Sequence, residues 1–134
     1  MMSLGNADHV AEIMRRVRSV RPESQAKWGR MSAHQMICHC GDALRMAVGE
    51  RSVTPVSGPL QRTVVKWIAL YAPLHWPPGI RTVPEIDQQA GGTRPVNFAD
   101  DLAQLESLLQ RFTTREMTER PVHPIFGRMS HKAW

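Results

Sequence analysis

Apolar residues recur at helical spacing near the start of the chain. Between Asp8 and Val20 they fall on one helical face, whereas the arginines point elsewhere, and the apolar stripe consists of Val10, Ile13, Met14, Val17 and Val20. Pro22 ends this segment because proline disfavours helical geometry in the residue before it. The spacing therefore predicts a first helix over about residues 8–20.

A second helix is predicted between Ser32 and Gly49. Gln35 follows Ser32 by three residues, which is the capping-box pattern that satisfies the first free backbone N–H groups of a helix. Gly49 is a suitable residue for the C-terminal end. We expect the inward face to be an apolar arc of Met36, Cys40, Ala43 and Ala47, flanked by Ile37, Leu44 and Met46.

Two further helices are predicted on either side of a long loop. A third helix is expected from Pro59 to about Ala72, with an apolar face of Leu60, Val64, Trp67, Ile68 and Tyr71. A fourth is expected from Phe98, with a stripe of Phe98, Leu102, Leu105, Leu108, Leu109 and Phe112. The intervening residues 73–97 contain five prolines, and we expect this crossover to pack its apolar residues across the helices.

The end of the chain predicts the start of one more helix. Ser130 is a natural N-cap, and residues 131–134 would form a first turn, which is too short to be stable alone. No strand alternation and no internal repeat is visible. We therefore predict one all-α domain over residues 1–134, an antiparallel four-helix bundle with a long crossover, in which the last helix is largely missing.

Composition supports a soluble protein of ordinary domain size. The chain has 134 residues, of which 42% are apolar and 22% charged. Its two cysteines, Cys38 and Cys40, are too close in sequence to close a useful disulfide loop, which favours a reduced compartment. Neither a secretory signal nor an apolar run of the ~18 to 20 residues that span a membrane is visible. We expect a cytoplasmic protein with no membrane partner.

The net charge is +5, from 17 Lys and Arg residues against 12 Asp and Glu residues. A basic group near the N-terminus could attract phosphates, and it consists of Arg15, Arg16, Arg18 and Arg21. We expect this group to occupy the solvated face of the first helix, and no zinc-finger or glycine-aromatic pattern accompanies it. Nucleic-acid binding is therefore disfavoured.

Among six histidines, His39 alone falls within the apolar arc of the second helix, whereas His34 falls on the opposite face. An imidazole inside a helical bundle can bind a metal, and Asp42, one turn later, could accept its other ring N–H. A core histidine bonded to a backbone carbonyl is the alternative interpretation. Successive helical residues splay by about 100°, so we expect Cys38 to be a surface thiol and Cys40 a small core residue.

Three sequence blocks resemble a branch of the DinB-like superfamily whose function is uncharacterised. They are residues 28–39 (WGRMSAHQMICH) with 42–45 (DALR), residues 91–95 (GGTRP), and residues 123–130 (HPIFGRMS). The His-Pro-x-Phe-Gly block is the most specific. Together the blocks extend from about Trp28 to the end of the chain.

This resemblance implies a four-helix bundle with a divalent metal, often zinc or nickel, held by three histidines. His39 matches the first ligand. In similar proteins the other two ligands follow a tryptophan that matches Trp134, on a His-rich last helix, and His131 precedes that cluster. The resemblance therefore implies a chain truncated before this helix, with an incomplete metal site that binds metal weakly or not at all.

Characterised superfamily members include thiol-dependent S-transferases and a maleylpyruvate isomerase, in which a metal can lower the pKa of a bound low-molecular-weight thiol. Our first hypothesis is a metal-dependent protein of the S-transferase type, with Trp76 and the crossover shaping its pocket. The alternative is a non-catalytic interaction module, because a bundle lacking most of a helix would expose an apolar groove for a second copy or a partner. The residues do not identify a substrate.

Overall fold

The computed structural model describes residues 4–54, 58–60, 63, 66–71, 82–114, 123 and 126–128 of the chain. The helices in this part are α1 (Ala7–Ser19), α2 (Ala33–Ala47), α3 (Lys66–Tyr71) and α4 (Phe98–Thr114), together with a 3-10 turn, η2 (Pro84–Ile86). The described residues form no β-strand, and only an isolated bridge joins His123 to Gly127. The all-α prediction is confirmed for this part of the chain.

The first helix forms where the apolar stripe predicts it. Asn6 caps α1, since its side chain accepts hydrogen bonds from the backbone N–H groups of Asp8 and His9. The stripe packs against the buried residues Leu105 and Leu109 of α4, and its contributing members are Ile13, Met14, Val17 and Val20. The arginines of α1 remain on the solvated face, as expected.

The second helix has the predicted ends but a different inward face. The capping box of Ser32 and Gln35 is formed, and Gly49 adopts a φ of 81° just beyond the helix, a conformation that favours glycine. The buried residues are Ile37, Cys38, Gly41, Asp42, Met46 and Ala47, whereas Met36 is 41% exposed. The predicted face is confirmed for Ile37, Met46 and Ala47, which are buried, and for Cys40 and Leu44, which pack against the core. It was wrong at Met36, and it missed Cys38, Gly41 and Asp42, because polar residues on this face find partners on neighbouring segments.

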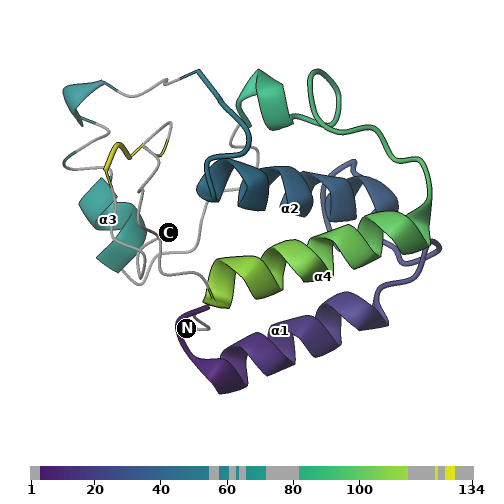
Figure 1. Cartoon of the computed structure of the whole chain (residues 1–134). Helices are drawn as coiled ribbons and strands as arrows, with labels where there is room; N and C mark the ends of the chain where they lie inside the picture. The colour runs from purple at the N-terminus through teal and green to yellow at the C-terminus, as the bar shows by residue number, and fades with distance from the viewer. Residues whose placement is uncertain are drawn as a thin grey trace.

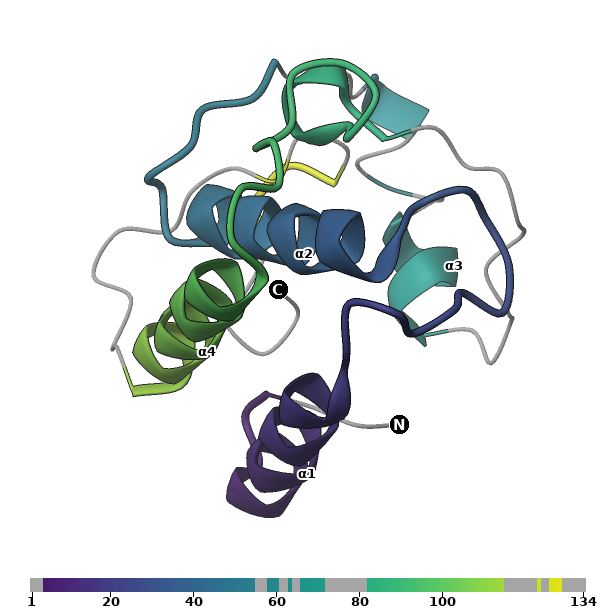
Figure 2. The ribbon, with the colours of Figure 1, turned by 90° about the vertical axis from the view of Figure 1, so that its right-hand side faces the viewer.

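Helix α4 lies between α1 and α2 (Figures 1 and 2). Its direction is antiparallel to α1 but parallel to α2 (Figure 1). Two side-chain contacts confirm that α2 and α4 are parallel. His34 contacts Asp101 near the starts of the two helices, and Glu50, just after α2, contacts Arg111 near the end of α4. The antiparallel expectation thus holds for α1 relative to both α2 and α4 but not for α2 relative to α4, since residues 82–97 bring the chain back beside the start of α2 (Figure 1).

Two clusters of buried apolar side chains hold these elements together. In one, Ile37 of α2 packs with Leu105 and Leu109 of α4. In the other, Met46 of α2 packs with Val83 and Ile86 of the crossover, and Val53 covers them. The prediction that the crossover packs its apolar residues across the helices is therefore confirmed for Val83 and Ile86, whereas Val96 is exposed.

Several predictions concern residues outside the described part. The third predicted helix is confirmed over Lys66–Tyr71, while Val64 lies outside. Trp76 and the predicted final turn, from Ser130 through His131 to Trp134, lie outside as well. None of the described helices combines the length and apolar character needed to cross a membrane.

Candidate metal centre

Three potential metal ligands meet where α2 and α4 begin. His34 and Cys38 are four residues apart on one face of α2, and Asp101 lies in the first turn of α4. One ligand atom from each residue lies within 4.8 Å of the other two. Imidazole nitrogen, thiolate sulfur and carboxylate oxygen are all zinc ligands. This group could therefore hold a metal ion.

Asp101 is the central member of the group. Its Oδ2 atom lies 2.6 Å from Nε2 of His34 and accepts a hydrogen bond from the backbone N–H of Val96 at 3.2 Å. Burial alone would raise the pKa of Asp101, but the hydrogen bonds from His34, Val96 and Cys38 outweigh it and lower that pKa. Asp101 is thus an ionised carboxylate positioned between a thiol and an imidazole.

The thiol of Cys38 is not activated as a nucleophile in this arrangement. Burial and the neighbouring charge of Asp101 raise the pKa of Cys38 to about 11. His34 and Cys38 both bond to Asp101, so the imidazole is not placed to take the thiol proton. A bound metal ion would replace that proton, because the thiolate is the metal-binding form.

The predicted placements of His34 and Cys38 were wrong. The His34 side chain is only 22% exposed and its ring packs edge-on against Phe98, with the ring centroids 5.3 Å apart. Cys38 is 4% exposed, whereas Cys40 is half-buried and packs against the core, in line with its prediction. Both errors follow from the rotated inward face of α2.

His39 is half-buried and contacts the crossover. Its Nδ1 atom lies 2.9 Å from the backbone carbonyl of Ile86. A carbonyl only accepts hydrogen bonds, so Nδ1 carries a proton, and in the neutral imidazole Nε2 is the atom with the lone pair. This tautomer suits a metal ligand and equally a core histidine. Among the described residues, no second and third ligand converge with His39.

Asp42 does not accept a hydrogen bond from His39, contrary to prediction. Its fully buried carboxylate accepts bonds from the backbone N–H and the hydroxyl of Thr93, at 2.8 and 2.6 Å, and from Nη1 of Arg51 at 2.6 Å. Arg51 also donates to the carbonyl of Gly91 at 2.6 Å. These contacts bind the Gly91–Thr93 turn to α2, and they occupy the Asp42 carboxylate in place of the predicted bond from His39.

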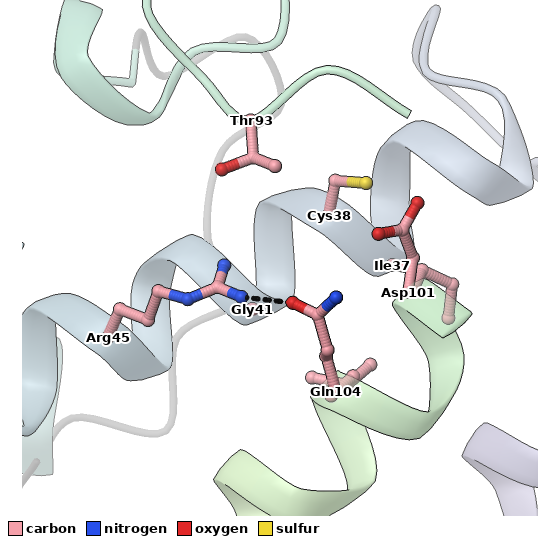
Figure 3. A pocket seen from close by; sticks show the side chains of 8 residues that line it. Ile37, Cys38, Gly41, Arg45, Thr93, Asp101 and Gln104 are labelled. Atoms are coloured by element: carbon pink, nitrogen blue, oxygen red, sulfur yellow. Dashed lines mark hydrogen bonds between the residues drawn. The ribbon is translucent and has the colours of Figure 1, made fainter. Parts of the chain in front are cut away.

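A small pocket adjoins two members of the ligand group. Cys38 and Asp101 line one side, and the other polar lining comes from Arg45, Thr93 and Gln104 (Figure 3). The space accommodates about one water-sized group. The pocket is therefore large enough for a single donor atom beside the ligands but too small for an organic substrate.

The basic residues of α1 are solvated, as predicted. Arg15 and Arg16 both pair with Glu12 at 2.7 Å, and Arg18 pairs with Glu106 at 3.0 Å. Their side chains are 62 to 69% exposed. Surface ion pairs of this kind add little stability. Their main effect is that the glutamates partly neutralise the positive charge of this face.

His123 and Gly127, the two ends of the His-Pro-x-Phe-Gly block, are joined by an isolated β-bridge. The rings of His123 and Phe126 stack with their centroids 4.9 Å apart, and Nδ1 of His123 accepts the backbone N–H of Phe126 at 3.1 Å. Burial, with the nearby charge of Lys66, lowers the pKa of His123. The stacking and the hydrogen bond to Nδ1 both hold the His123 ring against Phe126, which gives these two residues of the block a structural role.

Comparisons with known proteins add no identification, because the chain matches no protein-family model, no curated protein and no solved structure.

Proposed function

We propose that this chain binds a divalent metal ion between α2 and α4 through His34, Cys38 and Asp101. The proposal is carried by one observation, the approach of these three ligand atoms to within 4.8 Å of one another. The donor set favours zinc over magnesium or calcium, which prefer oxygen ligands. This ligand group is distinct from the site expected around His39. The incomplete ligand set around His39 therefore does not prevent metal binding by His34, Cys38 and Asp101.

The chain's own residues prepare this site. His34 and Cys38 are fixed in relative position by helix geometry, and the N–H of Val96 holds Asp101 from the other side. Binding requires loss of the Cys38 proton and of the hydrogen bond that now joins His34 to Asp101. The metal ion, when bound, supplies a positive charge that two anionic ligands neutralise.

A finer proposal is a DinB-like four-helix bundle with a metal-dependent, thiol-dependent S-transferase activity. It is supported by the three sequence blocks, by the helical character of the described residues, and by the free Nε2 lone pair of His39. It assigns a zinc or nickel ion to a site that includes His39. Such a metal, when bound, would lower the pKa of a low-molecular-weight thiol.

Zinc binding to matched cysteine variants separates the two ligand sets. We expect native mass spectrometry to find one zinc per chain in the parent and in the Cys40→Ser variant, but none in Cys38→Ser. Binding that survives Cys38→Ser but is lost in His39→Ala would overturn the proposed site in favour of the DinB-like one. A folded parent chain that takes up no zinc would contradict both metal proposals.

A second candidate function is helical self-association. Large apolar side chains on α3 face solvent, with Trp67 67% and Ile68 48% exposed, and Trp28 is 76% exposed. The adjacent exposed apolar groups of α3 favour a surface that another protein or a second copy covers. Sedimentation over a range of concentrations tests this, since the mass should rise toward that of a dimer. A constant monomer mass would count against self-association.

A further inference from the structure

Resting on this metal site, we propose that the bound ion keeps one coordination position directed at the adjoining pocket, where it takes a small monovalent anion through a single donor atom. His34, Cys38 and Asp101 supply three ligands. Zinc sites with three protein ligands commonly complete a four-coordinate shell with water or an exogenous group. The chain thus provides a binding site for a ligand and not only a closed structural site.

The pocket lies where the fourth ligand is needed. Cys38 and Asp101 line it directly, and its space matches one water-sized group. Gly41 forms part of its wall, and a Cβ atom there would lie 3.4 Å from Nη1 of Arg45 and 3.8 Å from Cδ1 of Leu108. The absence of a side chain at Gly41 therefore keeps this space open next to the ligand group.

The charges around the pocket favour an anion. A divalent ion bound by the Cys38 thiolate and the Asp101 carboxylate forms a neutral unit. Across the pocket, Arg45 is the lining cation, and its guanidinium lies 3.4 Å from the carboxylate of Asp42, which Arg51 binds more closely at 2.6 Å, so the Arg45 charge is only partly compensated. Because the surroundings are partly buried, this charge is weakly screened and attracts a negatively charged fourth ligand.

Gln104 adds a hydrogen-bond donor on the same side. Its Oε1 atom accepts a bond from Nη2 of Arg45 at 2.7 Å, which fixes the orientation of the amide. The amide nitrogen then lies on the side facing Asp101 and Cys38 (Figure 3). A neutral donor beside a cationic group suits an anion better than a second cation.

Cobalt(II) is a suitable probe because its spectrum reports both the thiolate ligand and the coordination shell. We expect the Co²⁺-loaded chain to show a sulfur-to-cobalt charge-transfer band, and chloride, a monatomic anion, to shift the visible bands saturably while that band persists. Arg45→Gln should weaken chloride binding about tenfold. Arg111→Gln, which removes an equal charge from the surface pair with Glu50, should change it less than about twofold.

A second variant covers the case in which Arg45→Gln does not fold. Gly41→Ala adds one methyl group to the pocket wall, and we expect it to retain the charge-transfer band but to weaken chloride binding at least about tenfold. If the band forms and chloride has no effect, the open position is wrong while the metal site stands. If chloride binds all variants equally, the open position is not directed at this pocket, which overturns the proposal. If no charge-transfer band forms in the folded parent chain, the metal site itself is wrong.

Discussion

The guanidinium of Arg51 lies 2.6 Å from the fully buried carboxylate of Asp42 and joins α2 to the crossover. Arg51 follows α2 by a few residues, and its second terminal nitrogen donates to the carbonyls of Glu85 and Gly91. The ion pair between Asp42 and Arg51 thus connects α2, the segment that follows α2, and the crossover. The turn that it fixes carries Thr93, one of the residues that line the pocket beside the candidate metal ligands.

Replacing Asp42 with alanine should destabilise the fold strongly. The substitution leaves the Arg51 guanidinium without its buried partner, and breaking a buried ion pair in this way costs about 3–5 kcal/mol. Urea unfolding followed by circular dichroism measures the effect. Glu50→Gln, which removes one partner of the surface pair with Arg111, is the matched control and should cost less than about 1 kcal/mol. Equal losses in the two variants would contradict the role of the Asp42 pair.

Thr93 offers a finer test of the same contacts. Its hydroxyl donates to Asp42 at 2.6 Å and accepts from Arg51 at 3.0 Å. Thr93→Val keeps the size but removes the hydroxyl, and we expect a loss of about 1–3 kcal/mol in the free energy of unfolding. Thr93→Ser restores the hydroxyl and should recover most of that loss. A serine variant as unstable as the valine variant would show that packing of the methyl group matters more.

Local sequence signals predicted the helices because their causes are local. The capping box at Ser32 and Gln35, the glycine at position 49 and the stripe of α4 all act within a few residues, and each is observed. The inward face of α2 was not predictable in this way. The inward face is set by Thr93 and Arg51, which bind the buried carboxylate of Asp42. Apolar periodicity alone does not predict that an aspartate is buried.

The candidate site was accessible to sequence reasoning only in part. The i, i+4 spacing of His34 and Cys38 on one helix is a readable signal, but apolar periodicity places both side chains toward solvent, so it does not predict a buried ligand pair. Asp101 is 67 residues from His34, and nothing local links them. Their approach depends on the parallel packing of α2 and α4, which follows from the return path of residues 82–97.

The buried thiol of Cys38 should react slowly with alkylating reagents. Burial and Asp101 raise its pKa to about 11, so at pH 8 only about one thiol in a thousand is ionised. In a Cys40→Ser background, iodoacetamide labelling followed by mass spectrometry should be at least about a hundredfold slower in the folded chain than in urea. The rate should rise with pH up to about 11. Similar labelling rates in the two states would show that Cys38 is accessible and ionised.

Glu12 should remain ionised in unusually acidic solution. Hydrogen bonds from Arg15 and Arg16 lower its pKa from 4.5 to about 2. Because the folded value lies below the unfolded value, the interaction stabilises α1 fully above pH 4.5 and is lost as the pH falls toward about 2. Carbon-13 NMR of the side-chain carboxyl measures the midpoint directly. A midpoint near 4.5, unchanged in an Arg15→Gln and Arg16→Gln double variant, would contradict these pairs.

Metal binding at His34, Cys38 and Asp101 should stabilise the fold, because these ligands lie on two helices and the unfolded chain does not bring them together. With free zinc at a hundred times its dissociation constant, the free energy of unfolding should rise by about 2.7 kcal/mol. Thermal unfolding with and without zinc measures this as an upward shift of the midpoint. A chelator should reverse the shift in the parent chain. Zinc should produce no shift in Asp101→Asn, but it should still produce one in Asp100→Asn, which changes an exposed neighbouring position. An equal shift in both aspartate variants would show that zinc stabilises the chain from another site.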